Sequence, residues 1–424
     1  MNQEAPKQDS PKPMSSMKTV SLKQSSKKKS LGNVLIGQSG GPTAVINQSL
    51  VGIVETCLAD KRIDRVLGAV HGIQGVLQNR IVDLGRESRK TLEAVAKTPS
   101  SALRSVRKKP TEEECRAILH RIEELDVHAF FYIGGNDSAE TANLIDQMAR
   151  EEGWELHLFH VPKTIDNDLR VTDHCPGYGS AAKFVAHAMM GDNEDNRSLP
   201  GIKIDVIMGR NAGWLTAASV LARRHEGDGP HLVYVPERVF TMESFLADVD
   251  RVYKQHGRCL IALSEGVHGP NGAPLVTSGE KDSHGNVQLS GSGALGDFLA
   301  DQIKSNLGAK LRVRADTFGY LQRSFAGLAS EVDAKEAREV GRVAAKAALA
   351  AKVPSGSIAI RRKGKKTYEV AYDVVELTQV AKNTRPLDER YIAGSNDIHE
   401  DFLDYVAPLV GKLPKTAHLS DHFI

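Results

Sequence analysis

Residues 33–58, "NVLIGQSGGPTAVINQSLVGIVETCL", contain the pattern that decides the fold. The first part is a short apolar run that ends in glycines, and the second part has apolar residues at helical spacing. Gly40 and Gly41 separate the predicted strand from the predicted helix, and Thr43 stands just before that helix. A strand, a glycine turn and a helix in this order form the first half of a βαβ unit, so they predict an α/β fold.

The same alternation continues along the chain. Residues 65–72 and 129–135 read as strands, and residues 111–125 read as an amphipathic helix. A second series of strand and helix signals follows in "IKIDVIMGR", "GWLTAASVLARR", "HLVYVPE", "SFLADVDRVYKQ" and "CLIALSEG", over residues 202–266. We therefore expect two Rossmann-like lobes, each a three-layer αβα arrangement with a mainly parallel sheet, and an active site in the cleft between them.

The composition limits the classes of function. The 424 residues are 41% hydrophobic and 25% charged, which is enough for about two or three globular domains. The net charge of +2 argues against a surface built for nucleic acid or an anionic membrane. The four cysteines are scattered without a CxxC pair, as in a protein of a reducing cytosol. No apolar run predicts a membrane span or a secretory signal, so we expect a cytoplasmic protein.

Two segments have compositions that do not favour a packed structure. Residues 1–30 are rich in Ser, Lys and Pro and poor in large apolar side chains, which predicts a disordered basic tail. The stretch from about 269 to 293 is rich in Gly and Ser and predicts a flexible insertion.

Three loops that follow predicted strands contain polar and glycine residues of interest. In "GQSGGPTAVIN" (37–47) and "YIGGNDSAETANLI" (132–145), glycines precede a helix, where backbone amides can face a phosphate. Taken alone, the second loop fits a tight turn with an Asp or Ser cap equally well. Neither loop is a Walker A sequence or a full GxGxxG.

The third loop, "VPKTIDNDL" (161–169), has Lys163 directly before a cluster of carboxylates. In isolation it is typical of a solvated loop with a local ion pair. It can also handle an anion, with Asp166 or Asp168 taking a proton or holding a metal. Because all three loops lie at strand ends, together they favour a phosphate site.

The chain also resembles a known family. In order, "QSGGPTAVIN", "GGNDS", "PKTIDNDL", "TDHCPGYGSAAK", "MGRNAGWL", "PERVF", "SEG" and "FGYLQRS" resemble the motifs of phosphofructokinases, in particular the pyrophosphate-dependent branch, over about residues 33–330. The resemblance implies a two-lobed α/β enzyme that needs Mg2+ and transfers a phosphoryl group from pyrophosphate to fructose 6-phosphate. The reaction would reversibly form fructose 1,6-bisphosphate and phosphate in glycolysis or gluconeogenesis. We expect small phosphate substrates and a homodimer or homotetramer.

The resemblance also suggests a division of the chain. Residues 31–175 would form a pyrophosphate-binding lobe, completed by about 325–385. Residues 176–324 would form the fructose 6-phosphate-binding lobe, and residues 386–424 a C-terminal extension.

Several residues match the catalytic positions of the family. Asp166 matches the general base that takes the proton of the attacking sugar hydroxyl. Asp168 matches a second carboxylate that holds magnesium or positions the base, and Thr164 matches a contact to the sugar or the transferred phosphoryl. The residues assigned to the catalytic step are Asp166, Thr164, Arg210, Lys163 and Asp137.

The acceptor site is implied by other matches. Arg210 would also stabilise the transferred phosphoryl, Glu265 would accept from a sugar hydroxyl, and Tyr320 and Arg323 would clamp the 6-phosphate. Arg314 matches an arginine that, in the family, reaches across a subunit interface. The residues that match the fructose 6-phosphate site are Thr164, Asp166, Met208, Gly209, Arg210, Glu265, Arg314, Tyr320 and Arg323.

The donor assignment depends on Lys163 and Asp137. Relatives that use ATP have a small residue, typically glycine, at both positions. Lys163 can reach the outer phosphate of pyrophosphate, and Asp137 can hold that lysine or a metal, so the pair would obstruct a nucleotide. The pyrophosphate-site matches are Gly40, Gly41, Arg107, Asn136, Ser138 and Lys163. The predicted metal ligands are Asn136, Asp137 and Asp168.

Two residues depart from the family pattern, and three other functions are alternatives. Asn136 replaces a common Asp ligand, and Arg104 replaces a glycine common in the loop before Arg107. An ATP-dependent phosphofructokinase of the same fold is the nearest alternative. A dinucleotide-dependent oxidoreductase would need a fuller GxGxxG. A non-catalytic binding module would be expected to lack Asp166.

Overall fold

The computed structural model describes residues 30–276, 293–364, 367–382 and 384–420. The predicted tail lies outside these ranges except for its last residue, and so do residues 277–292 of the predicted insertion. The described part of the predicted insertion begins with a turn over residues 269–273, which an antiparallel bridge between His268 and Pro274 closes.

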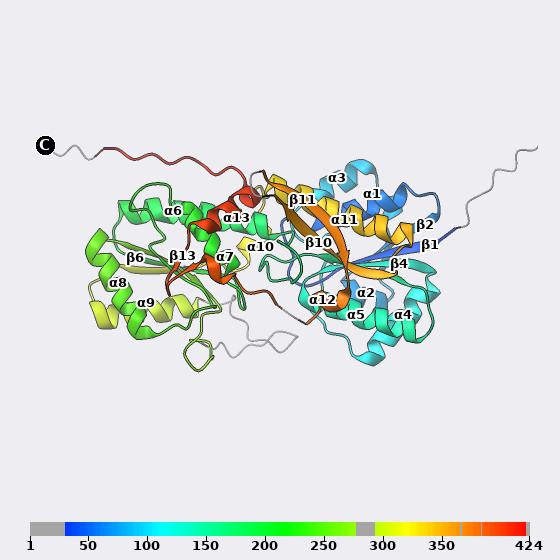
Figure 1. Cartoon of the computed structure of the whole chain (residues 1–424), viewed down its shortest axis with the longest axis horizontal. Coiled ribbons are helices and arrows are strands. Elements are labelled where there is room, and N and C mark those ends of the chain that lie inside the picture. The colour runs from blue at the N-terminus through cyan, green and yellow to red at the C-terminus, as the bar shows by residue number, and fades with distance from the viewer. Residues whose placement is uncertain (1–29, 277–292, 365–366, 383, 421–424) are drawn as a thin grey trace, which may run out of the picture.

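A seven-stranded sheet forms the first lobe (Figure 1). Its strands run in the order β11-β10-β5-β4-β1-β2-β3, and the central ones are parallel. They are buried on both faces, which explains their almost continuous apolar sequences. The strand bounds are Gly32–Gln38 (β1), Ile63–Ala69 (β2), Ile81–Asp83 (β3), Val127–Gly134 (β4), His157–Pro162 (β5), Ser355–Lys363 (β10) and Glu369–Val375 (β11).

Helices cover both faces of this sheet. One face packs against α1 (Ile46–Leu58), α3 (Arg89–Ala96) and α11 (Glu331–Ala350). The other face packs against α2 (Gly72–Leu77), α4 (Glu112–Glu124), α5 (Asn136–Glu151) and α12 (Leu377–Val380). A Thr111–Glu114 capping box begins α4, at the boundary expected from the sequence.

The second lobe contains a four-stranded parallel sheet in the order β7-β8-β6-β9. Its strands are Ile202–Ile207 (β6), Leu232–Tyr234 (β7), Cys259–Ser264 (β8) and Val313–Thr317 (β9). One face packs against α6 (Tyr178–Ser198), α7 (Trp214–Ala217), the 3-10 turn η2 (Ala218–Ala222) and α13 (Asp401–Val410). The other packs against α8 (Met242–His256) and α9 (Ala294–Leu307).

Short elements complete the chain: η1 (Leu84–Arg86), α10 (Leu321–Ser324), η3 (Glu389–Tyr391) and the pair β12 (Ile392–Ala393) and β13 (Asp397–Ile398). Residues from η3 to α13 bury Tyr391, Ile398 and Phe402 in the core that also contains α6. The predicted α/β class with mainly parallel sheets and helices on both sides is confirmed. None of the helices in the described part of the chain is both long and apolar enough to cross a membrane.

Candidate active site

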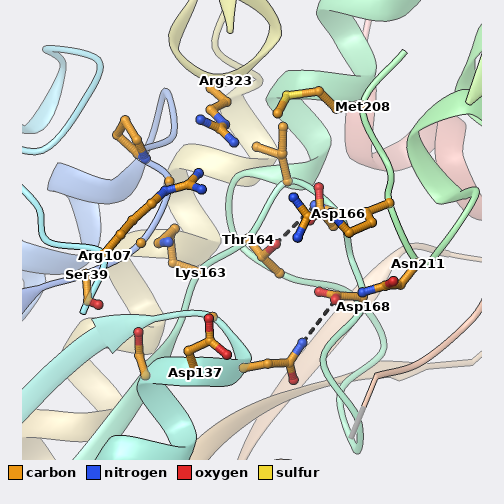
Figure 2. Close-up of a pocket in the computed structure, with 18 of the residues that line it drawn as sticks. Ser39, Arg107, Asp137, Lys163, Thr164, Asp166, Asp168, Met208, Asn211 and Arg323 are labelled. Atoms are coloured by element: carbon orange, nitrogen blue, oxygen red, sulfur yellow. Dashed lines mark hydrogen bonds between the residues drawn. The ribbon is translucent and has the colours of Figure 1, made fainter. Parts of the chain in front are cut away.

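A cavity of about 310 Å³ lies between the carboxyl ends of the strands of the two lobes (Figure 2). Residues from both lobes line it. They are Ser39, Gly40, Gly41, Pro42, Arg107, Lys108, Gly135, Asn136, Asp137, Ser138, Thr141, Lys163, Thr164, Ile165, Asp166, Asp168, Met208, Arg210, Asn211, Glu265, Tyr320, Arg323 and Thr384.

The loop after β1 brings its backbone close to two cations. Gly40 has a φ of +74°, which favours glycine, and a Cβ there would lie 3.2 Å from Lys163 Nζ. A Cβ on Gly41 would lie 3.2 Å from Arg323 Nε. A larger residue at Gly40 or Gly41 would therefore occupy the space beside Lys163 or Arg323. This loop can present backbone amides to an anion that those cations neutralise.

Lys163 follows β5 and is only 2% exposed. Its backbone N–H donates to Gly134 O at 3.0 Å, which ties it to the end of β4. Burial, together with the positive charge of Arg323, lowers the pKa of Lys163 to about 7. The side chain points toward Arg107 and Arg323, so three cations converge on this part of the cavity (Figure 2). Such a cluster is stable only near an anion or another compensating charge.

The predicted link between Asp137 and Lys163 is not formed. Both residues line the cavity, but no ion pair among the described residues joins them. The carboxylates that raise the pKa of Lys163, against burial, are Asp166 and Asp168. Asp137 lies in the first turn of α5 and is not held by the lysine.

The loop after Lys163 carries Asp166 and Asp168. The backbone N–H of Asp166 donates to Thr164 Oγ1 at 3.1 Å, which orients the turn. Burial raises the pKa of Asp166, while Arg323 and Lys163 oppose that rise. Burial and the charge of Asp166 raise the pKa of Asp168. The arrangement provides a carboxylate that is poised to accept a proton beside strong positive charges.

The second lobe contributes the opposite wall. The backbone N–H of Met208 donates to Gln322 Oε1 at 3.2 Å, which joins the "MGR" turn to the "YLQR" segment. The guanidinium of Arg323 lies over the ring of Tyr320, with its carbon 4.6 Å from the ring centre. Gly209 has a φ of +144°, and a Cβ there would lie 2.5 Å from Ala212 O. That conformation lets Met208 and Arg210 both reach the cavity.

The structure brings together all but two of the predicted site residues. Gly209 is the turn between two lining residues and does not line the cavity itself. Arg314 is exposed on β9, and its guanidinium donates to Val313 O at 3.0 Å. Its role across a subunit interface therefore stays a prediction. Arg104, the other departure from the family pattern, adopts a φ of +60°, a conformation that favours glycine.

Sequence reasoning missed eight lining residues: Ser39, Pro42, Lys108, Gly135, Thr141, Ile165, Asn211 and Thr384. Most of them stand next to motif residues in the sequence, and this position could have identified them as lining residues. Thr384 comes from a C-terminal segment with no recognisable motif.

The donor side of the cavity has suitable ligands for a divalent cation. Asn136 Nδ2 donates to Asp168 Oδ2 at 3.0 Å, while Asn136 Oδ1 is buried and accepts no hydrogen bond from a described residue. Within the part of the chain that the structure describes, two other groups with carboxylates could hold a metal, Glu194–Asp228–His418 and Asp192–Asp205–Asp316, and neither includes a cavity residue. Carboxylates and an amide oxygen suit Mg2+, which commonly completes its coordination with substrate phosphates and water.

The chain is similar to known proteins over most of its length. Residues 33–348 match the family model described as phosphofructokinase. The pyrophosphate–fructose 6-phosphate 1-phosphotransferase of Rhodospirillum rubrum is 48% identical over 397 residues, covering 92% of this chain and 97% of that protein. A sulfofructose kinase of Alkalicoccus urumqiensis is 36% identical over 316 residues, covering 74% and 79%.

A solved structure is also similar. The pyrophosphate-dependent phosphofructokinase of Marinobacter aquaeolei superimposes with a TM-score of 0.80 at 32% identity, covering 92% of this chain and 94% of that one.

Proposed function

The chain belongs to the phosphofructokinase family, and we propose that it is a pyrophosphate:fructose 6-phosphate 1-phosphotransferase. The names of its similar relatives support the reaction, and the cavity supports the donor. The observation that carries the proposal is Lys163, which is almost fully buried beside the Gly40 loop. A lysine side chain at that place occupies space that a nucleotide would need, and it provides the charge that pyrophosphate needs.

The chemistry follows from the positions of these groups. Asp166 accepts the proton of the sugar 1-hydroxyl as that oxygen attacks the outer phosphorus of pyrophosphate. The new O–P bond forms while the bridging P–O bond breaks, and orthophosphate leaves. Lys163, Arg107 and Arg323 neutralise the charge that moves from the donor to the leaving group.

The acceptor would be held mainly by the second lobe. Arg210 and Glu265 line its wall, and Tyr320 and Arg323 lie where the 6-phosphate would be clamped. Because Arg323 also lies beside Gly41, it is near the donor as well as the acceptor. We therefore assign it to both phosphate groups.

Phosphofructokinases generally use a divalent metal ion, and we propose Mg2+. Asp168, Asp137 and Asn136 are the residues that would hold it, together with phosphate oxygens. When bound, the ion would neutralise donor phosphate charge and hold the donor in line with the acceptor.

One assay tests the proposal. The purified enzyme, supplied with fructose 6-phosphate and Mg2+, is given pyrophosphate or ATP at matched concentrations, and fructose 1,6-bisphosphate is measured. We expect turnover with pyrophosphate and little with ATP. A preference for ATP would replace this proposal with the ATP-dependent alternative, and no product with either donor would reject both.

A further inference from the structure

The loop that carries Asp166 and Asp168 has little regular structure, only isolated bridges at Thr164 and Leu169. Between Thr164 and Val171 it contains no helix or strand. Asn167, between the two carboxylates, has a φ of +57°, and Val171 has a φ of +64°. A left-handed conformation is tolerated by Asn, but it is strongly disfavoured for a β-branched residue such as Val. The loop therefore depends on contacts from outside it.

Arg385 supplies the largest set of those contacts. Its guanidinium donates to Thr172 O at 2.7 Å and Asp173 O at 2.6 Å through Nη1, and to Asn167 O at 2.8 Å through Nη2. Its backbone N–H also donates to Asp168 O at 2.7 Å. These acceptors lie on both sides of Val171, so one side chain closes the strained turn.

Arg385 is itself fixed by the second lobe. Its guanidinium carbon lies 4.5 Å from the centre of a ring of Trp214, and Trp214 Nε1 donates to Arg385 O at 3.3 Å. Among the described ion pairs none involves Arg385, and its Nε is buried without a hydrogen-bond partner. The guanidinium thus donates to main-chain carbonyls. Contacts to several carbonyls in different directions require a planar group with several N–H donors, and a positive charge alone does not provide them.

Tyr405 adds a second, smaller anchor. Asn167 Nδ2 donates to the Tyr405 hydroxyl at 2.8 Å, and that hydroxyl donates to Asp173 O at 2.9 Å. Both anchors come from the C-terminal part of the chain.

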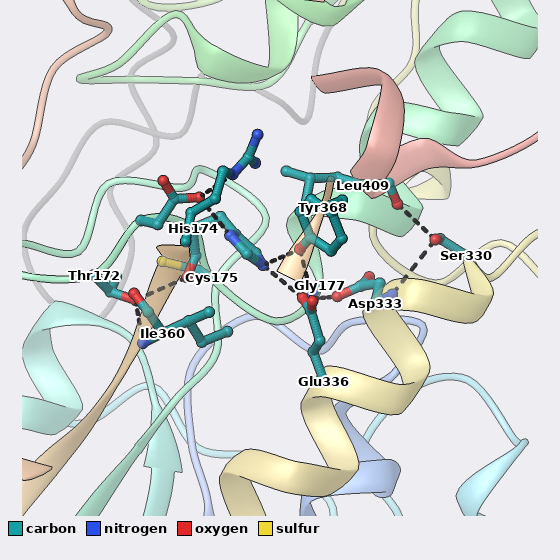
Figure 3. Close-up of polar contacts among 12 residues, drawn as sticks. Thr172, His174, Cys175, Gly177, Ser330, Asp333, Glu336, Ile360, Tyr368 and Leu409 are labelled. Carbon is teal, nitrogen blue, oxygen red and sulfur yellow. Dashed lines mark hydrogen bonds and ion pairs between the residues drawn. The ribbon is translucent and has the colours of Figure 1, made fainter. Parts of the chain in front are cut away.

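The residues that follow the loop are held differently (Figure 3). Thr172 Oγ1 accepts from Ile360 N at 2.9 Å, and His174 lies between Asp173 and Glu336. These contacts fix the segment after the loop to β10 and α11 of the first lobe. They do not reach Asn167 O or Asp168 O, which are the carbonyls next to the two carboxylates.

We infer that Arg385 is a positioning residue that holds Asp166 and Asp168 in the geometry required for phosphoryl transfer, an inference that rests on the proposed function. Arg385 does not line the cavity, so it acts through the loop rather than on a substrate. The acceptor-binding residues of the second lobe lie on other segments. Loss of Arg385 should therefore reduce kcat much more than it raises the KM for fructose 6-phosphate.

The test compares Arg385→Lys with the wild type in the pyrophosphate-dependent assay. Lysine keeps the charge but cannot donate to three separated carbonyls, and misplacement of a catalytic group by about 1 Å can cost about 10²-fold in rate. We expect a fall in kcat of that order with KM nearly unchanged. Free guanidinium added to Arg385→Ala should restore part of the lost rate, which a merely structural role would not predict.

Arg258→Lys is the matched control. Arg258 is buried and, like Arg385, donates to main-chain carbonyls, Gly227 O at 2.7 Å and Asn193 O at 3.3 Å; it also donates to Asn193 Oδ1 at 3.0 Å and is not connected to the loop. This variant should keep the wild-type kcat even where its melting temperature falls. Tyr405→Phe removes only the smaller anchor, so its kcat should fall about tenfold. This variant replaces the Arg385 variants as the test if they do not fold.

The inference is overturned if folded Arg385→Lys retains the wild-type kcat, or if its kcat falls no further than that of Arg258→Lys. If only Tyr405→Phe folds, full activity of that variant overturns the inference. A wild-type enzyme that fails with pyrophosphate would instead reject the proposed function. In that event, amide hydrogen exchange of residues 164–175 still decides whether Arg385→Lys releases the loop: faster exchange supports the inference and unchanged exchange overturns it.

Discussion

Asp166 lies where positive charge from both lobes converges, and its proposed role as general base can be tested alone. Asp166→Asn preserves the shape of the side chain but removes its ability to accept a proton. We expect kcat to fall by about 10²–10⁴-fold, the usual contribution of a positioned base, with substrate affinity retained. Steady-state kinetics and a direct binding measurement for fructose 6-phosphate would check this. Near wild-type turnover would remove Asp166 from the mechanism.

Lys163 and Asp137 can be separated by their effects on the two donors. Lys163→Gly should severely reduce turnover with pyrophosphate, because the leaving phosphate loses a buried cationic partner. It should gain little ATP activity while Asp137 remains in the cavity. Asp137→Gly should open space and measurably raise the use of ATP. Kinetics of both single variants and the double variant with both donors would decide the matter, and an intact pyrophosphate rate in Lys163→Gly would contradict the donor assignment.

The lowered pKa of Lys163 also predicts a pH dependence. A lysine loses its positive charge above its pKa, which burial and Arg323 lower to about 7 in the free enzyme. The kcat/KM for pyrophosphate should therefore fall as pH rises through about 7. Lys163→Arg, measured in the same buffers, controls for ionisation of pyrophosphate, because arginine stays charged. If both proteins show the same alkaline fall, Lys163 is not its cause.

At the scale of elements, α1 and α11 meet through two glycines. A Cβ on Gly52 would lie 2.2 Å from Arg338 O, and a Cβ on Gly341 would lie 2.2 Å from Ser49 O. The helix backbones are therefore in direct contact, and a methyl group would force them apart. Since α11 leads into β10, this contact fixes the C-terminal part of the first lobe to its N-terminal part.

Gly341→Ala should lower the free energy of unfolding by about 1–3 kcal/mol, the usual cost of overpacking a tight contact. Gly191→Ala is the matched control, because Gly191 is an exposed helical glycine in α6 with no atom within 4 Å of a Cβ. That change should be neutral or stabilise by about 0.5–1 kcal/mol. Thermal and denaturant unfolding of both variants would measure the difference, and equal stabilities would show that the helices can move apart freely.

The sequence predicted the elements whose pattern is local. The predicted strand at 129–135 and the predicted helix at 111–125 agree within two residues with β4 and α4, because apolar runs and apolar periodicity mark them. The predicted helix at 213–224 is only a short α7 followed by the 3-10 turn η2. Helix α6 had not been predicted, since it is buried on several sides and lacks a clear polar face.

The site residues also differ in how far the sequence alone predicts them. The residue types at the ends of predicted strands identify the glycine loops and the lysine–aspartate loop. Gly40, Lys163 and Asp166 were therefore predictable. Thr384 and Arg385 were not, because their positions depend on contacts with a segment far away in the sequence: Thr384 bridges to Leu169, and Arg385 donates to Asn167 O. No ion pair among the described residues joins Asp137 to Lys163, because side-chain directions within a cavity depend on tertiary packing, and the alternative that Asp137 holds a metal stays a prediction.

For the whole molecule, we propose domain boundaries that follow the two sheets. The first domain comprises residues 31–175 with about 325–385. The second comprises residues 176–324, and we add residues 386–420 to it because Tyr391, Ile398 and Phe402 lie in its core. With these boundaries the chain crosses between the lobes three times.

The proposed reaction should run in both directions. Exchange of pyrophosphate for orthophosphate leaves a smaller driving force than hydrolysis of ATP, and the same groups serve the reverse step. With fructose 1,6-bisphosphate and orthophosphate, the enzyme should therefore form pyrophosphate, which phosphorus NMR would detect directly. If no pyrophosphate appears at high phosphate, the donor assignment is wrong.

The pairing of β5 with β10 has a consequence for synthesis on the ribosome. Residues 355–357 pair with residues 158–160, so the whole second sheet is translated between the two partners. Until then the nascent chain exposes one edge of β5, and this edge is an open template for pairing with other strands. Arg385 emerges later still. A ribosome that stalls shortly after residue 324 would release a protein that has every motif of the site but lacks β10 and β11, so the edge of β5 would stay unpaired.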